Sequence, residues 1–172
     1  NGDHGIDSNN SPYNTLVGNT VHGNGTVGIN FEGETATGSH HATVVNNISV
    51  GNGFTPPNGS FGGNLRVDSA SIDGTLLDYN IFDLRDAPYQ IRWNGSSYDS
   101  LAAFRAVAPT QEVHGLEGDP LFVSPISSVL RTNDETYIVP VNIGNYYLNA
   151  GSPAIDSANA DALGQPLTDI VG

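Results

Sequence analysis

The sequence lacks cysteine, methionine and lysine, and it contains no long hydrophobic run. Without cysteine the chain can form no disulfide, no thiolate zinc site and no cysteine nucleophile. No stretch approaches the roughly 18 consecutive apolar residues that a membrane-spanning helix needs. Because methionine is absent and the first residues read as the middle of a repeat, we expect a signal peptide and upstream repeats to precede this segment in a secreted protein.

Basic residues are also scarce. Five arginines face 18 acidic residues, which gives a formal net charge of −13. Such a charge repels phosphate backbones and anionic lipid headgroups, so we expect neither nucleic acid nor membrane as a partner. The acidity fits a solvated surface, and it also fits a few carboxylates that converge on Ca²⁺, the one cofactor that the sequence suggests.

Internal repetition is the strongest positive signal in these 172 residues. Five residues recur at an offset of 28: Val17, Asn19, Gly23, Asn24 and Gly25 return as Val45, Asn47, Gly51, Asn52 and Gly53. A weaker third copy runs over 76–82, and a second series of short alternating segments covers 5–9, 28–32 and 64–68. Short strands that return at intervals of tens of residues bury their apolar faces only by stacking, which predicts an all-β solenoid.

Asparagine occupies equivalent turns of the repeat at Asn19, Asn47 and Asn80. Asparagine tolerates left-handed backbone and can bond to the chain above or below, so we expect a stacked ladder of these side chains. The coils cover 1–87, and 88–172 hold a flanking helix and the closing coils and tail of the same domain. The pattern predicts the helix over 101–107, with a capping box at Ser96 and Asp99.

Two segments near the C-terminus carry a family resemblance, Gly118-Asp119-Pro120-Leu121-Phe122-Val123 and the run from Asn145 to Asp156 that contains Gly151-Ser152-Pro153-Ala154-Ile155. After Asn-rich coils, they resemble the closing coils of secreted bacterial right-handed parallel β-helix repeat proteins of the pectate-lyase-like superfamily. The resemblance implies a right-handed parallel β-helix with one short flanking helix and an irregular C-terminal tail. It implies a polysaccharide partner and an extracellular location, but no single activity.

Strand alternation defines a candidate surface if Ile6, Ile29 and Leu65 stack inward. Outward residues then form two columns: Asp7, Asn30 and Arg66 in one, and Asn9, Glu32 and Asp68 in the other. With coils about 4.8 Å apart, Asp7 and Glu32 would lie about 8 Å apart, a separation suited to inverting glycosidases. Glu32 and Asp68 would lie about 5 Å apart, which suits a retaining pair or a shared Ca²⁺.

The candidate catalytic residues are therefore Asp7, Glu32, Arg66 and Asp68, and the candidate metal ligands are Glu32 and Asp68. The candidate substrate-binding residues are Asn9, Asn30 and Trp93, the last because sugar rings stack on aromatic faces. Lyases and epimerases of the resembling group commonly use Lys or Arg at the reacting carbon, which leaves Arg66 or Arg92 here.

Three functions remain open from the sequence. The chain can be part of a polysaccharide-degrading enzyme, either a glycoside hydrolase or a lyase, that acts through an acidic groove. It can also be a non-catalytic module that binds glycans or adheres to surfaces, or a structural spacer. An exposed first coil would leave an open sheet edge, so we expect upstream coils or another chain to pair there.

Overall fold

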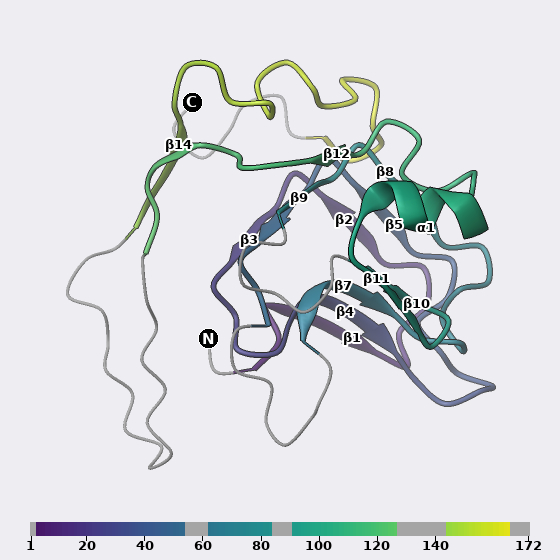
Figure 1. Ribbon diagram of the computed structural model, residues 1–172. Coiled ribbons are helices and arrows are strands. Elements are labelled where there is room, and N and C mark those ends of the chain that lie inside the picture. Colours follow the sequence, from purple (N-terminus) through teal and green to yellow (C-terminus); the bar gives the residue numbers. More distant parts are fainter. Residues whose placement is uncertain (1–2, 54–61, 84–90, 127–143, 166–172) are drawn as a thin grey trace, which may run out of the picture.

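The computed structural model describes residues 3–53, 62–83, 91–126 and 144–165, and it shows an all-β chain with one helix (Figure 1). Most strands belong to three sheets, and within each sheet the strands are neighbours in order along the chain. Sheet A contains β1 (Ile6–Asn9), β4 (Val27–Glu32), β7 (Gly63–Val67), β10 (Ile91–Trp93) and β11 (Ser96–Tyr98). Sheet B contains β2 (Thr15–Val17), β5 (Thr43–Val45) and β8 (Leu76–Asp78), and sheet C contains β3 (Thr20–His22), β6 (Ile48–Val50), β9 (Ile81–Asp83) and β12 (Leu116–Glu117).

Three consecutive strands, one from each sheet, make up one repeat: β1 to β3, β4 to β6, and β7 to β9. Each strand pairs in parallel with its equivalent in the next repeat, and the offset of 28 is the register of Val17 with Val45. The predicted stacking of Ile6, Ile29 and Leu65 is confirmed, because these three residues are register partners on β1, β4 and β7. Parallel pairing also continues beyond residue 88, since β10 pairs with β7 and β12 pairs with β9.

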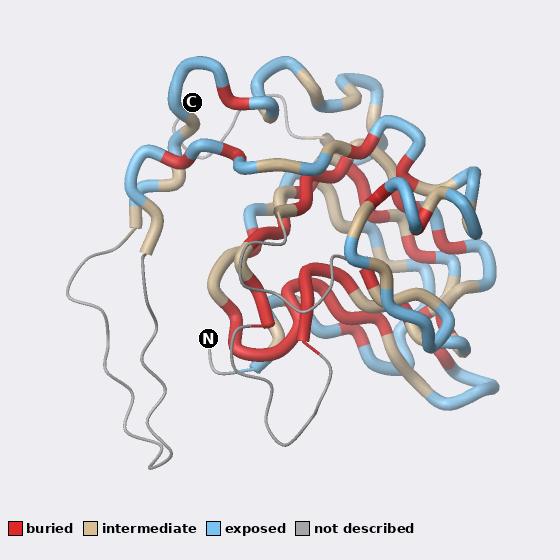
Figure 2. The backbone as a smooth tube through the Cα atoms, viewed as in Figure 1, coloured by how far each residue is buried: buried red, intermediate tan, exposed pale blue. Residues whose placement is uncertain are grey.

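The core lies between the three sheets, where buried residues line the interior of the chain path (Figure 2). Alternate residues of sheet A point inward, and the same spacing on β5 and β8 supplies their partners. The fully or almost fully buried apolar residues include Ile29, Phe31, Val44, Leu65, Val67, Leu77 and Ile91. Buried apolar side chains in successive repeats therefore form continuous columns.

The helix α1 (Leu101–Val107) is confirmed, but its predicted cap is wrong. Ser100 is the N-cap, and its side chain accepts a hydrogen bond from the Ala103 N–H at 3.2 Å. Ser96 instead begins β11, because Asn94 and Gly95 have the positive φ angles, 50° and 82°, of a two-residue hairpin turn between β10 and β11. Ser96 of the expected capping box therefore belongs to the hairpin and not to the start of the helix.

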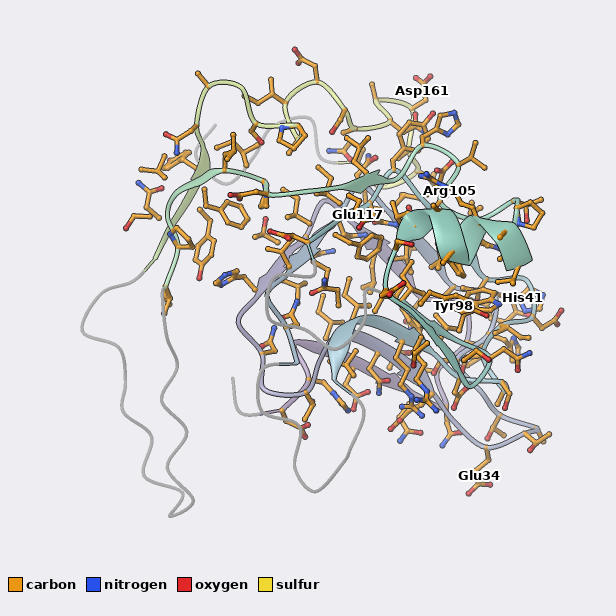
Figure 3. All side chains as sticks on the ribbon, in the orientation of Figure 1. Glu34, His41, Tyr98, Arg105, Glu117 and Asp161 are labelled. Carbon is orange, nitrogen blue, oxygen red and sulfur yellow. The ribbon has the colours of Figure 1, made fainter. Side chains whose placement is uncertain are left out.

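The helix covers the β10 and β11 end of the core. Its buried residues are Leu101 and Phe104, and Phe104 contacts the rings of Trp93 and Tyr98 at centroid distances of 5.7 and 5.6 Å. Tyr98 lies directly below the helix, with Arg105 on the helix above it (Figure 3). The helix is thus a lid over this end of the apolar columns.

The two tail motifs lie against each other and against the stack. The antiparallel strands β13 (Phe122–Ser124) and β14 (Asn145–Leu148) are followed by a turn in which the Ser152 hydroxyl donates to the Pro120 carbonyl at 2.6 Å. Farther along, Asn46 Nδ2 donates to the Asn159 carbonyl at 2.9 Å, and Asn159 N–H donates back to Asn46 Oδ1 at 2.8 Å. The tail is therefore joined to the corner between β5 and β6.

The predicted asparagine ladder is confirmed at that corner. Asn19 donates through its backbone N–H and Nδ2 to Asn47 Oδ1 at 3.0 and 2.9 Å. Asn47 donates in the same way to Asn80 Oδ1, at 2.9 Å in both cases. Asn80 then donates to the two carboxylate oxygens of Glu112, so a buried acid ends this ladder.

A second ladder stands at the corner that follows sheet C. Asn24 donates through N–H and Nδ2 to Asn52 Oδ1, and Asn52 donates in the same way to Asn64 Oδ1. Asn64 Nδ2 finally donates to the Asp83 carbonyl at 2.9 Å. All three asparagines are buried, so the ladder satisfies polar groups that water does not reach.

Candidate functional site

The first predicted column lies on successive strands of sheet A, and its members contact one another. Asp7, Asn30 and Arg66 are register partners on β1, β4 and β7. Asn30 Nδ2 donates to Asp7 Oδ1 at 2.8 Å, and Arg66 Nη1 donates to Asn30 Oδ1 at 2.9 Å. Asn30 is fully buried, so its amide fixes the two charged groups on either side of it.

Glu32 joins the same cluster through Arg66. The two side chains form an ion pair in which Arg66 Nη1 donates to Glu32 Oε2. Partial burial alone would raise the pKa of Glu32, but the hydrogen bonds from Arg66 and Asn30 and the charge of Arg66 together hold that pKa below its ordinary value. Glu32 is therefore ionised at neutral pH.

The second predicted column is only partly assembled. Asn9 pairs with Glu32 in register, and its Nδ2 lies 3.5 Å from Glu32 Oε1. Asp68 follows β7, but its carboxylate accepts hydrogen bonds from the backbone N–H groups of Gly33 at 3.0 Å and Ala70 at 3.1 Å. These bonds hold Asp68 as a loop anchor, while Glu32 pairs with Arg66.

This arrangement does not fit a Ca²⁺ site formed by Glu32 and Asp68. Ca²⁺ takes six to eight oxygen ligands, whereas the carboxylates of Glu32 and Asp68 are bound to Arg66 and to backbone N–H groups. Within 3–53, 62–83, 91–126 and 144–165, no three His, Cys, Asp or Glu side chains lie close enough together to hold a metal ion.

Trp93 and Arg92 lie on β10, the next strand of sheet A. Trp93 is half-buried, and its ring packs against Phe104 of the helix, so most of it belongs to the interface between helix and core. Arg92 is the register partner of Arg66, so the two arginines belong to the same face of sheet A.

We use the name sheet A cluster for Asp7, Asn30, Glu32 and Arg66. Its groups are two carboxylates, one amide and one guanidinium, joined by hydrogen bonds across three strands. Protonation of a glycosidic oxygen needs a carboxylic acid whose pKa is raised, whereas the pKa of Glu32 is lowered. The cluster is therefore better suited to hydrogen bonding and charge stabilisation than to general acid catalysis by Glu32.

Among the described residues, a strongly raised pKa belongs to Glu112, which sequence reasoning missed. Burial raises the pKa of Glu112 to about 8, against the opposing effect of the two hydrogen bonds from Asn80. No sequence motif indicates this residue, because Glu112 takes the place of the next asparagine in the ladder of Asn19, Asn47 and Asn80 and lies 32 residues after Asn80. The second ladder does have a signal in the sequence, the recurrence of Asn24 as Asn52.

Comparison with known proteins gives no match to a family model, to a curated protein or to a solved structure. Within the described residues, no helix has the length and apolar character needed to cross a membrane.

Proposed function

We propose that the chain is part of a right-handed parallel β-helix in a secreted, carbohydrate-directed protein, and that the sheet A cluster binds a polysaccharide. Three parallel sheets, each built from one strand per repeat, support the β-helix. The ladders at two corners and the closing motifs around Pro120 and Ser152 support it further. In such a stack, the outer face of one sheet is a long polar surface that can follow an extended chain.

The observation that carries the proposal is the hydrogen-bonded connection of Asp7, Asn30 and Arg66 across three adjacent strands. Planar carboxylate, amide and guanidinium groups are good partners for sugar hydroxyls, and these groups are fixed before any ligand arrives. The strand spacing repeats the polar groups at about 4.8 Å, close to the length of one sugar unit. A polysaccharide laid across the strands would meet Asp7, Glu32 and Arg66, which the buried Asn30 holds in place from beneath.

An enzyme is the second candidate, either a polysaccharide lyase or a glycoside hydrolase. The observation that favours it is the pairing of ionised Glu32 with Arg66, beside Asp7. A guanidinium can stabilise negative charge that develops at a reacting carbon, and a nearby carboxylate can accept a proton. The lowered pKa of Glu32 weakens it as a base, which is why binding is the first proposal.

Retention on a panel of insoluble neutral and acidic polysaccharides tests the binding proposal. We expect Arg66→Gln to lower the affinity at least about tenfold, equivalent to about 1.4 kcal/mol, because it removes the charge and the link between Asn30 and Glu32. Arg66→Lys keeps the charge but not the planar group, so it separates the two contributions. Asp161→Asn, on the exposed tail far from sheet A in Figure 3, is the matched control.

Two further measurements decide between the candidates. Release of reducing ends or absorbance from unsaturated products, abolished by Glu32→Gln, would establish an enzyme in place of a passive binding module. Retention without product, sensitive to Arg66→Gln, would establish binding alone. The proposal fails if no polysaccharide is retained, or if Asp161→Asn weakens retention as much as Arg66→Gln while both variants keep the circular dichroism of the parent.

A further inference from the structure

The two asparagine ladders have a direction. In the interior repeats, asparagine donates its backbone N–H and one Nδ2 hydrogen to the asparagine of the next repeat, as Asn47 does to Asn80. The same Nδ2 group also donates to a carbonyl of the preceding repeat, from Asn47 to Leu16 at 3.0 Å and from Asn52 to Val21 at 3.1 Å. Each interior Oδ1 accepts from the preceding repeat, so the acceptor side of the ladder faces the residue-1 end.

At the first repeat this pattern is incomplete. Asn24 is 6% exposed and donates to Asn52 Oδ1, yet across the described residues its own Oδ1 accepts no hydrogen bond. Nor does its Nδ2 donate to any carbonyl of the kind that Val21 supplies to Asn52. Asn19 Oδ1 likewise has no donor within the described part of the chain. Asn24 is buried, and a buried polar atom without a partner is energetically costly, so the open groups of Asn24 point to an absent partner.

The strand edges coincide with these open acceptors. The first strands β1, β2 and β3 stand at the edge of sheets A, B and C respectively. Three parallel edges and the acceptor ends of two ladders therefore belong to the same first repeat, at the end of the stack opposite the helix α1. Open strand edges normally pair with another strand or are covered.

We propose that this face is a docking surface for one further repeat of the same kind, which runs parallel to β1, β2 and β3 and carries asparagine at both corners. Its corner residues would donate N–H and Nδ2–H to Asn19 and Asn24. Its carbonyl at the position equivalent to Val21 would accept the second Nδ2 hydrogen of Asn24, as Val21 accepts that of Asn52. All the open groups that we have described are then satisfied in the geometry already present between the first and second repeats.

The direction of the ladders disfavours a second copy of this chain as the occupant. Two copies meeting face to face would place Oδ1 acceptors against Oδ1 acceptors, and their strands would have to pair antiparallel. The opposite end of the stack cannot serve as the partner either, because Glu112 ends one ladder and α1 covers the core there. The proposal depends on the sheets and ladders alone, so it stands whether or not the sheet A cluster binds a glycan.

The test supplies the missing repeat by duplication. Ile6 and Ile29 are register partners, so Asp3–Gly25 is one complete period. A second copy of Asp3–Gly25, placed directly before Asp3 in place of Asn1 and Gly2, would continue the chain as Gly25 continues into Thr26. We expect the melting temperature to rise by on the order of 5–10 °C, because each kcal/mol gained is worth about 2–4 °C in a chain of this size.

The matched control changes the two copied asparagines, equivalent to Asn19 and Asn24, to aspartate. Aspartate keeps the shape and the backbone N–H but replaces the Nδ2 donor by an acceptor, so most of the rise should be lost. Hydrogen exchange gives a second readout, since amides of β1, β2 and β3 that point to the open edge should become protected only in the asparagine version.

Three results would overturn the proposal. One is an unchanged melting temperature and unchanged exchange in the duplicated protein. Another is an equal rise in the aspartate control, which would mean that added length rather than ladder chemistry stabilises the stack. The third is a dimer of the parent protein in light scattering that the duplication abolishes, which would make a second copy the occupant.

Discussion

Replacing Glu112 by glutamine should change how the stability of the fold depends on pH. Glu112 is fully buried, and its carboxyl oxygens accept hydrogen bonds from Asn80 N–H at 3.3 Å and Asn80 Nδ2 at 2.6 Å. The charged groups that face it are Asp78, whose charge raises the pKa of Glu112, and Arg105, whose charge lowers it. His114 forms an ion pair with Asp78 when protonated and so moderates the effect of Asp78.

The sign follows from proton binding. The folded-state pKa of Glu112 is about 8 and the ordinary value is 4.5, so between these pH values the folded protein binds more protons than the unfolded chain. Stability contributed by this group is therefore fully present below about pH 4.5 and is lost as the pH rises through 8. At about 1.36 kcal/mol per pKa unit, the interval corresponds to on the order of 5 kcal/mol.

Glutamine does not ionise, and its amide hydrogens would face the Asn80 N–H. Glu112→Gln should therefore lower the free energy of unfolding by about 1–3 kcal/mol at pH 5. As the pH rises to 8.5, ionisation of Glu112 destabilises the parent but not the variant. The difference in unfolding free energy between the two proteins should therefore shrink and can change sign. Urea unfolding of both proteins from pH 5 to pH 8.5 measures this difference. Glu34→Gln, on an exposed loop that projects from the molecule in Figure 3, is the control and should follow the parent. A difference between parent and Glu112→Gln that stays constant across this range would refute the reasoning.

Three other substitutions test the ladders, the packing and the sheet A cluster. Asn47→Ala should lower the free energy of unfolding by about 3–5 kcal/mol, because several buried groups lose their hydrogen bonds, whereas Asn19→Ala at the open end should lower it by about 1 kcal/mol. Equal losses for the two variants in urea unfolding would contradict the ladder. Gly28→Ala would place a Cβ 2.5 Å from Asn52 Nδ2 and Ser49 Oγ, whereas the Cβ of Gly23→Ala would meet no atom within 4 Å and would only strain a φ of 67°. The melting temperature of Gly28→Ala should therefore be well below that of Gly23→Ala, and the reverse order would contradict the packing. Arg66→Gln should raise the pKa of Glu32, measured by carboxyl NMR titration, and an unchanged pKa would show that Arg66 does not hold it down.

Features of the fold that repeat regularly can be predicted from the sequence, and irregular ones cannot. The offset of 28 predicts the registers of β2 with β5 and of β3 with β6, because both repeats keep the same length between those strands. The third repeat gives a weaker signal because its spacing differs, and the second ladder passes from Asn52 to Asn64 after only 12 residues. Glu112 could not be predicted, since an acid that ends an asparagine ladder is recognisable only once the repeats are stacked.

In the candidate site, too, some contacts can be predicted from the sequence and others cannot. Alternation along β1, β4 and β7 predicts that Asp7, Asn30 and Arg66 share a face, and the structure places them together. It does not predict that Asp68 turns to backbone N–H groups of Gly33 and Ala70, because that choice depends on the loop after β7. Strand periodicity fixes which residues are neighbours, while side-chain partners at strand ends depend on loop geometry.

Unequal spacing between register partners has a consequence for how this architecture can vary. Ile6 and Ile29 are 23 residues apart, whereas Ile29 and Leu65 are 36 residues apart, and both pairs are aligned on neighbouring strands. The strands on either side of the extra residues therefore stay in register. Insertions between the strands can be gained, lost or exchanged one at a time, so the molecule can acquire new ligand preferences while its core sequence stays unchanged.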